Sequence, residues 1–291
     1  MKLSIIVPVL NQHELTTTCL DMTVNNLSGK EDVELIVLDN GSDIGFDYKT
    51  EKVKGRTIYY LKSIGVYPTF WEGLKHSTGD VLAFFHSDLV ISEKNWDQRV
   101  LDTFRKDDKL GLVGFIGSNE IDASGGRGLG TTSNFQGGTV RNATKEWKGS
   151  SAYIHGKVNS GFSNAVVVDG CSMIFRRSVL EQIPQRTNFP PHHFYDRLLS
   201  CEVLEKGYTI GVLGIACDHI SGQTVNQEQN YHTLAEEWSR KNISPFNWIA
   251  ASEESQFNWD ATIYKEAERQ WLSEYRDQKH FIPRKTYNGI I

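Results

Sequence analysis

A wholly apolar segment, residues 81–85, ends abruptly at His86, Ser87 and Asp88. An apolar run of this length is typical of a strand buried on both faces, as in parallel sheets. Ligands of open α/β sheets bind outside the carboxyl ends of the strands, so His86 and Asp88 are expected at a ligand-binding edge. A carboxylate placed there can hold a divalent cation against phosphate oxygens. The alternative interpretation is a strand-to-loop turn stabilised by the Ser and Asp side chains.

Similar apolar segments alternate with helical patterns through the first half of the chain. Strands are predicted at residues 3–9, 33–38, 57–61 and 112–116, and helices begin near Asn11, Pro68 and Ser92. Asn11, with Glu14 three residues later, is expected to cap the first helix, and Ser92 the third. Repeated strand–helix–strand units predict an α/β fold with a mostly parallel sheet, helices on both faces and the strand ends along one edge.

The second half begins with residues 118–164, which are rich in Gly, Ser, Thr and Asn and show no sustained period. A loop of this length is usually functional or mobile, and we interpret it as a lid that closes over a ligand. Strands are predicted again at residues 171–175 and 208–216. Between them, a helix is predicted at residues 194–206, ended by Gly207 in the position of a left-handed cap.

Two domains are expected, residues 1–222 as the α/β domain and residues 223–291 as a helical extension. The extension carries four of the seven tryptophans of the chain, at positions 238, 248, 259 and 271. Because Trp is mostly buried, we expect the extension to pack on the first domain. Stacking on a sugar ring and a homo-oligomer interface are the alternatives.

Composition excludes several classes of protein. The net charge of −5 argues against an electrostatic footprint for nucleic acid. No apolar stretch has the length needed to span a membrane. The four cysteines form no C-x-x-C pair, which favours reduced thiols and a cytoplasmic location.

Five segments, in this order along the chain, resemble family 2 glycosyltransferases of the GT-A fold. These segments are residues 4–11, 34–42, 79–88, 169–177 and 194–208. The resemblance implies an inverting, non-processive enzyme that moves a sugar from a nucleotide-sugar donor, with UDP as the expected nucleotide, to a hydroxyl of a glycan or other acceptor. It also implies Mn²⁺ or Mg²⁺ as cofactor, because a divalent cation offsets the charge that grows on a diphosphate leaving group.

The resemblance also assigns roles to individual residues. Asp88 and His219 match the metal ligands, whereas His86 stands where the family more often carries Asp. Asp196 matches the catalytic base, which takes the proton of the acceptor hydroxyl. Tyr195 replaces the acidic residue that often precedes the base, and Glu202 is the reserve candidate for this role.

The donor nucleotide is expected to contact residues at the ends of several strands. This set comprises Pro8, Val9, Asn11, Glu14, Asp39, Ser63, Gly65, His86 and Ser87, and Asp39 is expected to meet the uracil. The acceptor side comprises Asp169, Gly170 and Trp71. Glu14 is equally explained as part of a helix cap, and Trp71 as a core residue.

Two other functions remain open at this stage. A sugar-phosphate nucleotidyltransferase shares a similar scaffold, but it needs a Gly-rich loop after the first strand, where this chain has residues 11–14. A catalytically degenerate sugar- or nucleotide-binding protein is the second alternative, supported by the departures at His86 and Tyr195.

Overall fold

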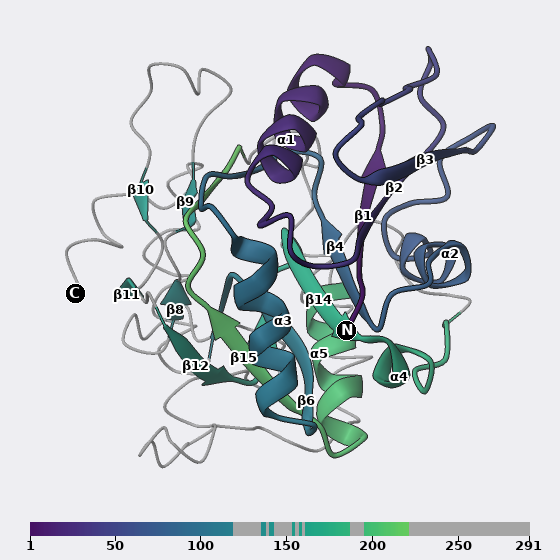
Figure 1. Cartoon of the computed structure of the whole chain (residues 1–291). Coiled ribbons are helices and arrows are strands. Elements are labelled where there is room, and N and C mark those ends of the chain that lie inside the picture. The colour runs from purple at the N-terminus through teal and green to yellow at the C-terminus, as the bar shows by residue number, and fades with distance from the viewer. Residues whose placement is uncertain are drawn as a thin grey trace, which may run out of the picture.

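The computed structural model describes residues 1–118, 161–186 and 195–220, with four short strands between the first two segments (Figure 1). The expected extension at residues 223–291, and most of the expected lid at residues 118–164, lie outside the described residues. The helices are α1 (His13–Asn25), α2 (Thr69–His76), α3 (Trp96–Lys106), α4 (Arg177–Leu180) and α5 (Tyr195–Glu205). None of the helices in the described part of the chain is long and apolar enough to cross a membrane.

Eight strands form the central sheet, in the order β12-β15-β6-β14-β4-β1-β2-β3. Their bounds are β1 (Leu3–Val9), β2 (Val33–Asp39), β3 (Lys54–Tyr59), β4 (Val81–Phe85), β6 (Leu110–Gly114), β12 (Phe162–Ala165), β14 (Ser172–Arg176) and β15 (Thr209–Leu213). Strands β3, β2, β1 and β4 pair in parallel, as do β15 and β6, whereas β14 and β12 run antiparallel to their neighbours. The predicted α/β fold with a mostly parallel sheet is therefore confirmed.

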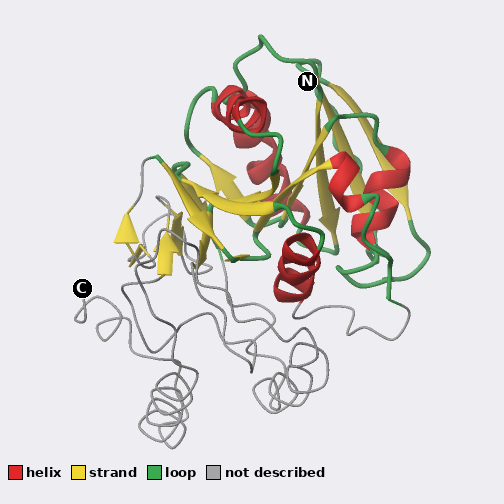
Figure 2. Cartoon of the chain, turned by 90° about the horizontal axis from the view of Figure 1, so that it is seen from below, coloured by secondary structure: helices red, strands yellow, loops and turns green. Residues whose placement is uncertain are grey.

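Helices cover both faces of this sheet (Figures 1 and 2). Successive residues of β1 alternate between two cores: Ile5 and Val7 pack with α1 and α3, and Ile6 packs with α2, α4 and α5. Strands β1 and β4 are apolar throughout most of their length because neither of their faces meets water. The carboxyl ends of these strands remain as the edge that can meet a ligand.

Two small four-stranded sheets stand beside the central one, in the orders β10-β9-β16-β5 and β11-β8-β7-β13. Their strands are β5 (Leu89–Ile91), β7 (Ile116–Ser118), β8 (Phe135–Gly137), β9 (Val140–Asn142), β10 (Tyr153–Ile154), β11 (Lys157–Val158), β13 (Val167–Val168) and β16 (Cys217–His219). The pairing of β16 with β5 matters most, because β5 follows directly after the His86–Asp88 turn.

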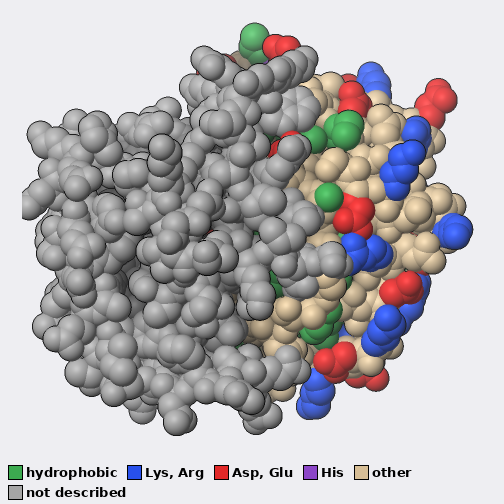
Figure 3. All heavy atoms as spheres, turned by 90° about the vertical axis from the view of Figure 1, so that its left-hand side faces the viewer, with side chains coloured by type: hydrophobic (Ala, Val, Ile, Leu, Met, Phe, Trp, Pro, Cys, Tyr) green, Lys and Arg blue, Asp and Glu red, His purple; other side chains and the backbone are tan. Residues whose placement is uncertain are grey.

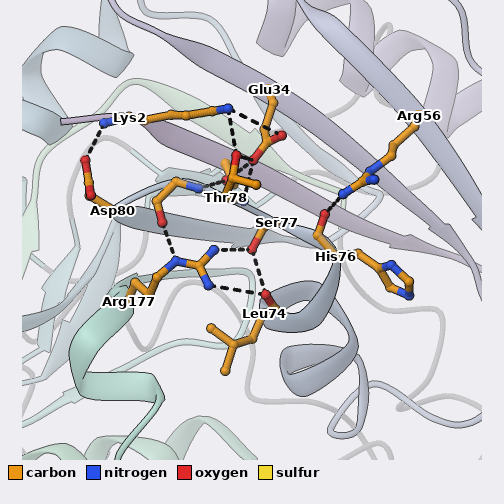
Figure 4. A network of polar contacts seen from close by, with 11 residues as sticks. Lys2, Glu34, Arg56, Leu74, His76, Ser77, Thr78, Asp80 and Arg177 are labelled. Atoms are coloured by element: carbon orange, nitrogen blue, oxygen red, sulfur yellow. Dashed lines mark hydrogen bonds and ion pairs between the residues drawn. The ribbon is translucent and has the colours of Figure 1, made fainter.

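A polar network closes the amino-terminal edge of the sheet, opposite the expected ligand edge (Figure 4). The Glu34 carboxylate accepts hydrogen bonds from the Ser4 hydroxyl (2.7 Å) and from the Thr78 amide (2.7 Å), and the Lys2 ammonium lies 3.6 Å away. The Arg177 guanidinium donates to the main-chain carbonyls of Leu74, in α2, and Gly79, just before β4, and to the Ser77 hydroxyl. This network ties β1, β2, β4 and α4 together.

Charged side chains of both signs are mixed on the face of the molecule that Figure 3 shows. Figure 3 shows acidic and basic groups interspersed over the described part of one face, without a patch of one sign there. This distribution agrees with the small net negative charge.

Two predicted helix caps are wrong. Residue Gln12, not Asn11, precedes α1, and Asn95 precedes α3; neither makes a side-chain cap. The Asn11 side chain instead bonds Asp43 in the loop after β2, and the Ser92 hydroxyl donates to the Ala216 carbonyl at 3.0 Å. Both residues are used in contacts with distant parts of the chain.

Candidate active site

The segment after β4 is a tight turn that carries the side chains of His86 and Asp88. The Leu89 amide donates to the His86 carbonyl at 3.2 Å, which closes the turn around Ser87 and Asp88. The His86 amide donates to the Cys171 carbonyl at 3.1 Å, so the turn is also anchored to the start of β14. The expectation that His86 and Asp88 stand at the carboxyl edge of the sheet is therefore met.

His219 reaches the same place from a segment more than 130 residues later. Strand β16 runs antiparallel to β5 with His219 opposite Leu89, the residue after Asp88. A hydrogen bond from the Ile220 amide to the Asp88 carbonyl, 3.0 Å long, fixes this register. The pairing thus brings the His219 imidazole beside the Asp88 carboxylate.

Three ligand-type atoms form a compact triangle at this edge. His219 Nε2 lies 3.3 Å from Asp88 Oδ1, His86 Nδ1 lies 3.8 Å from the same oxygen, and the two nitrogens are 3.4 Å apart. A point equidistant from all three lies about 2.0 Å from each, which is the length of a typical bond from a transition metal to nitrogen or oxygen.

The Asp88 carboxylate supports this interpretation. Oδ1 is buried and makes no hydrogen bond to any described residue, although His219 Nε2 lies 3.3 Å from it. A buried carboxylate oxygen without a hydrogen bond costs free energy unless another partner, such as a cation, satisfies it. His86, Asp88 and His219 therefore fit a divalent cation. The sequence analysis had assigned His86 to the donor nucleotide instead.

Electrostatics favour the ligand forms of Asp88 and His86. Burial raises the pKa of Asp88, but the charges of His219 and His86 outweigh it, so the pKa lies below its ordinary value and the group is a carboxylate at neutral pH. Burial lowers the pKa of His86 by more than the neighbouring carboxylates raise it, so this ring is neutral at pH 7. Burial also lowers the pKa of His219, but the charge of Asp88 raises it by more, so the net pKa lies above its ordinary value.

Two further carboxylates face the same cluster. Asp88, Asp169 and Asp196 all raise the pKa of His86, in this order of strength. Asp169 lies in the turn before β14, where its carboxylate accepts the Cys171 amide at 3.0 Å. The predicted metal ligand Asp88 and the predicted base Asp196 therefore both act electrostatically on the same imidazole.

Asp196 occupies the first turn of α5 and is half-buried. Its Oδ1 accepts the amide of Arg197 at 2.8 Å, a contact typical of an acidic residue at a helix start. The reserve candidate Glu202 is 6% exposed and pairs with Arg186, so a structural role explains it.

Asp39 ends β2 and organises the loop that follows. Its side chain is 2% exposed, and its two oxygens accept the amides of Ser42 (3.0 Å) and Phe46 (2.7 Å). Strand β1 lies between β2 and β4, so Asp39 and His86 are separated by two strand spacings, about 10 Å. Both lie along the carboxyl edge of the sheet.

The other predicted donor residues line this edge to different degrees. Asn11 is exposed and its amide donates to the Ser42 hydroxyl at 2.9 Å, which joins the loops after β1 and β2. Asn11 and Gln12 both have positive φ values, 54° and 59°, an uncommon conformation for residues other than glycine. Backbone strain of this kind is frequent at binding sites.

The remaining donor residues lie around these loops. Pro8 and Val9 end β1, with Pro8 half-buried and Val9 buried; Ser87 is half-buried in the turn, and Glu14 is exposed in the first turn of α1. Ser63 and Gly65 lie after β3, where Gly65 has a φ of 82° and its carbonyl accepts the Asn40 side chain at 3.1 Å. The loops after β1, β2 and β3 are thus bonded to one another.

Trp71 on the acceptor side is largely explained by packing. Its ring lies edge-on to Tyr67 with centroids 4.7 Å apart, and its indole N–H donates to the Ile183 carbonyl at 3.3 Å. Gly170 lies against the ring of Tyr195, which itself contacts His86.

The sequence of residues 66–244 matches the model of the Glycosyltransferase like family. Because this match covers more than half of the 291 residues, the chain belongs to that family, and the resemblance noted from its motifs is confirmed. No curated protein sequence matches the chain significantly.

Similar solved structures are GT-A glycosyltransferases. The mannosyltransferase PcManGT from Pyrobaculum calidifontis, in complex with GDP-Man and Mn²⁺, aligns with a TM-score of 0.52 at 12% identity, over 99% of this chain and 83% of its own. S. aureus TarS 1-349 in complex with UDP-GlcNAc aligns with a TM-score of 0.52 at 14% identity, over 95% of this chain and 73% of its own. At these identities the likeness establishes the GT-A fold alone.

Proposed function

We propose that this enzyme moves a sugar from a nucleotide-sugar donor, with UDP as the expected nucleotide, to a hydroxyl of a glycan or other acceptor, with inversion and with a divalent cation. The observation that carries the proposal is the triangle of His86 Nδ1, Asp88 Oδ1 and His219 Nε2, with edges of 3.3 to 3.8 Å. It stands at the carboxyl edge of the sheet, where ligands of open α/β folds bind.

His86, Asp88 and His219 would hold the cation. When bound, the cation supplies positive charge that stabilises the diphosphate leaving group. The Mn²⁺ and GDP-Man in PcManGT, and the UDP-GlcNAc in TarS, support a metal and a nucleotide-sugar here. Two imidazoles and one carboxylate suit Mn²⁺ better than Mg²⁺, which prefers oxygen ligands.

The nucleoside would extend along the edge toward β2. The loops after β1, β2 and β3, joined through Asn11, Asp39 and Asn40, form the wall there. Asp39 already accepts hydrogen bonds from two main-chain amides. We therefore propose that Asp39 shapes this wall in addition to contacting the nucleobase of the donor.

Asp196 would act as the base. As the acceptor oxygen bonds to the anomeric carbon, its proton passes to the Asp196 carboxylate and the nucleoside diphosphate leaves with the electron pair of the broken bond. Attack on the face opposite the leaving group inverts the anomeric configuration. The role of Asp196 as the base is supported by its electrostatic interaction with His86, since Asp196 raises the pKa of that imidazole.

The test is a panel of nucleotide sugars with Mn²⁺, Mg²⁺ or EDTA, scored by release of nucleoside diphosphate. We expect turnover with one donor that EDTA abolishes, loss of turnover in Asp196→Asn with donor binding retained, and unchanged turnover in Asp102→Asn, an exposed carboxylate on α3. NMR of the product anomer tests inversion. Full turnover in Asp196→Asn would remove the base assignment, and binding without turnover for every donor would favour the degenerate binding protein.

A cytoplasmic location remains part of the proposal. All four cysteines belong to the described residues, are buried, and form no disulfide. Reduced thiols are the normal state in the cytoplasm.

A further inference from the structure

We propose that Tyr195 is a positioning residue for the metal site, holding the His86 ring so that its Nδ1 lone pair faces Asp88 and His219. The inference rests on the proposed function, because it concerns the same cation. It adds a residue from α5 to a site that is otherwise built from the turn between β4 and β5 and from β16.

The two nitrogens of His86 have different partners. Nε2 lies 2.5 Å from the Tyr195 hydroxyl oxygen, and Nδ1 lies 3.4 Å from His219 Nε2. A neutral imidazole carries one proton, on one nitrogen only. When Nε2 carries it and donates to Tyr195, Nδ1 is free to bind a cation; the other tautomer would place a proton where the cation belongs. The partner of the second nitrogen commonly fixes the tautomer of a metal-binding histidine.

Tyr195 is itself held rigidly. It is 5% exposed, and its ring lies 5.5 Å from that of Phe70. A Cβ on Gly170 would lie 2.5 Å from the Tyr195 hydroxyl oxygen, so only glycine permits the ring to sit this close to the main chain. The hydroxyl is therefore fixed in the position from which it contacts His86.

The first experiment measures Mn²⁺ affinity by calorimetry, without donor. We expect Tyr195→Phe to bind Mn²⁺ about tenfold or more weakly, the usual effect of removing the partner of a metal-binding histidine. Tyr67→Phe is the matched control, since Tyr67 is equally buried and its hydroxyl accepts the Arg186 amide away from the site. Its affinity should equal that of the wild type.

A double-variant comparison separates positioning from general loosening of the site. The His86→Asp variant has no imidazole whose tautomer Tyr195 could fix. Adding Tyr195→Phe to it should therefore change Mn²⁺ affinity by less than about twofold, the expectation for uncoupled changes. An equal loss in both backgrounds would overturn the inference in favour of a structural role. Equal affinity of Tyr195→Phe and wild type would overturn it as well, while the proposed metal site would stand. Absence of Mn²⁺ binding by the wild type would refute that site itself.

A measurement on the wild type decides the matter if Tyr195→Phe does not fold. In ¹⁵N-histidine NMR of the metal-free protein, with the His86 signal assigned from His86→Gln, the proton should be on Nε2. A proton on Nδ1 would overturn the inference.

Discussion

The loop after β2 offers a quantitative test of how the donor side is built. Replacing Asp39 by Ala removes the acceptor of two main-chain hydrogen bonds, from Ser42 at 3.0 Å and from Phe46 at 2.7 Å. The carboxylate is 2% exposed, so water cannot fully replace it. An unsatisfied buried donor costs about 1–3 kcal/mol. The Phe46 amide is buried and the Ser42 amide partly buried, so we expect Asp39→Ala to lower the free energy of unfolding by about 2–4 kcal/mol.

Urea unfolding at pH 7, followed by circular dichroism, measures this difference. Asp43→Ala is the matched control, because Asp43 lies in the same loop, is exposed, and bonds only Asn11 through its side chain. We expect a loss below about 1 kcal/mol for that variant. A similarly small loss in Asp39→Ala would refute the view that this carboxylate organises the loop.

Three further predictions concern the opposite edge of the sheet and the support of the site. Burial raises the pKa of Glu34, but hydrogen bonds from Ser4 and Thr78 outweigh it, so the pKa lies below its ordinary value of 4.5. The stabilisation by Glu34 is therefore present above pH 4.5 and is lost as pH falls through the folded-state pKa. The difference in unfolding free energy between wild type and Glu34→Gln should therefore shrink below pH 4.5; a constant difference in a pH series of urea titrations would contradict this. Arg177→Met should destabilise the protein by about 2–4 kcal/mol in the same assay, since three hydrogen bonds from a charged group are lost. Gly170→Ala should weaken Mn²⁺ binding in calorimetry, because its Cβ would displace the Tyr195 hydroxyl; unchanged affinity would count against that contact.

Much of the central sheet could be predicted because burial on both faces leaves a clear mark in the sequence. Strand β1 has the predicted bounds, β2 extends one residue further, and α5 differs by one residue at each end. The edge strand β3 was predicted less well, at 57–61 instead of Lys54–Tyr59, because most of its residues are exposed and carry no apolar pattern.

The proposed metal site could be predicted only in part. Asp88 and His219 followed from the resemblance, but His86 was placed with the donor because the family more often has Asp there. Its membership depends on the register of β16 against β5, which joins segments more than 100 residues apart. The helix caps failed for the same reason, since Asn11 and Ser92 bond partners 32 and 124 residues away.

The contact of Tyr195 with His86 carried no sequence signal of its own. The chain folding that brings α5 to the end of β4 is needed to show that these two residues meet.

An anomalous difference map from a crystal containing Mn²⁺ and UDP tests the central claim most directly. The account predicts one strong peak within bonding distance of His86 Nδ1, Asp88 Oδ1 and His219 Nε2, with diphosphate oxygens completing its coordination. A nucleotide bound at the carboxyl edge of the sheet with the Mn²⁺ peak elsewhere, or with no peak at all, would contradict it.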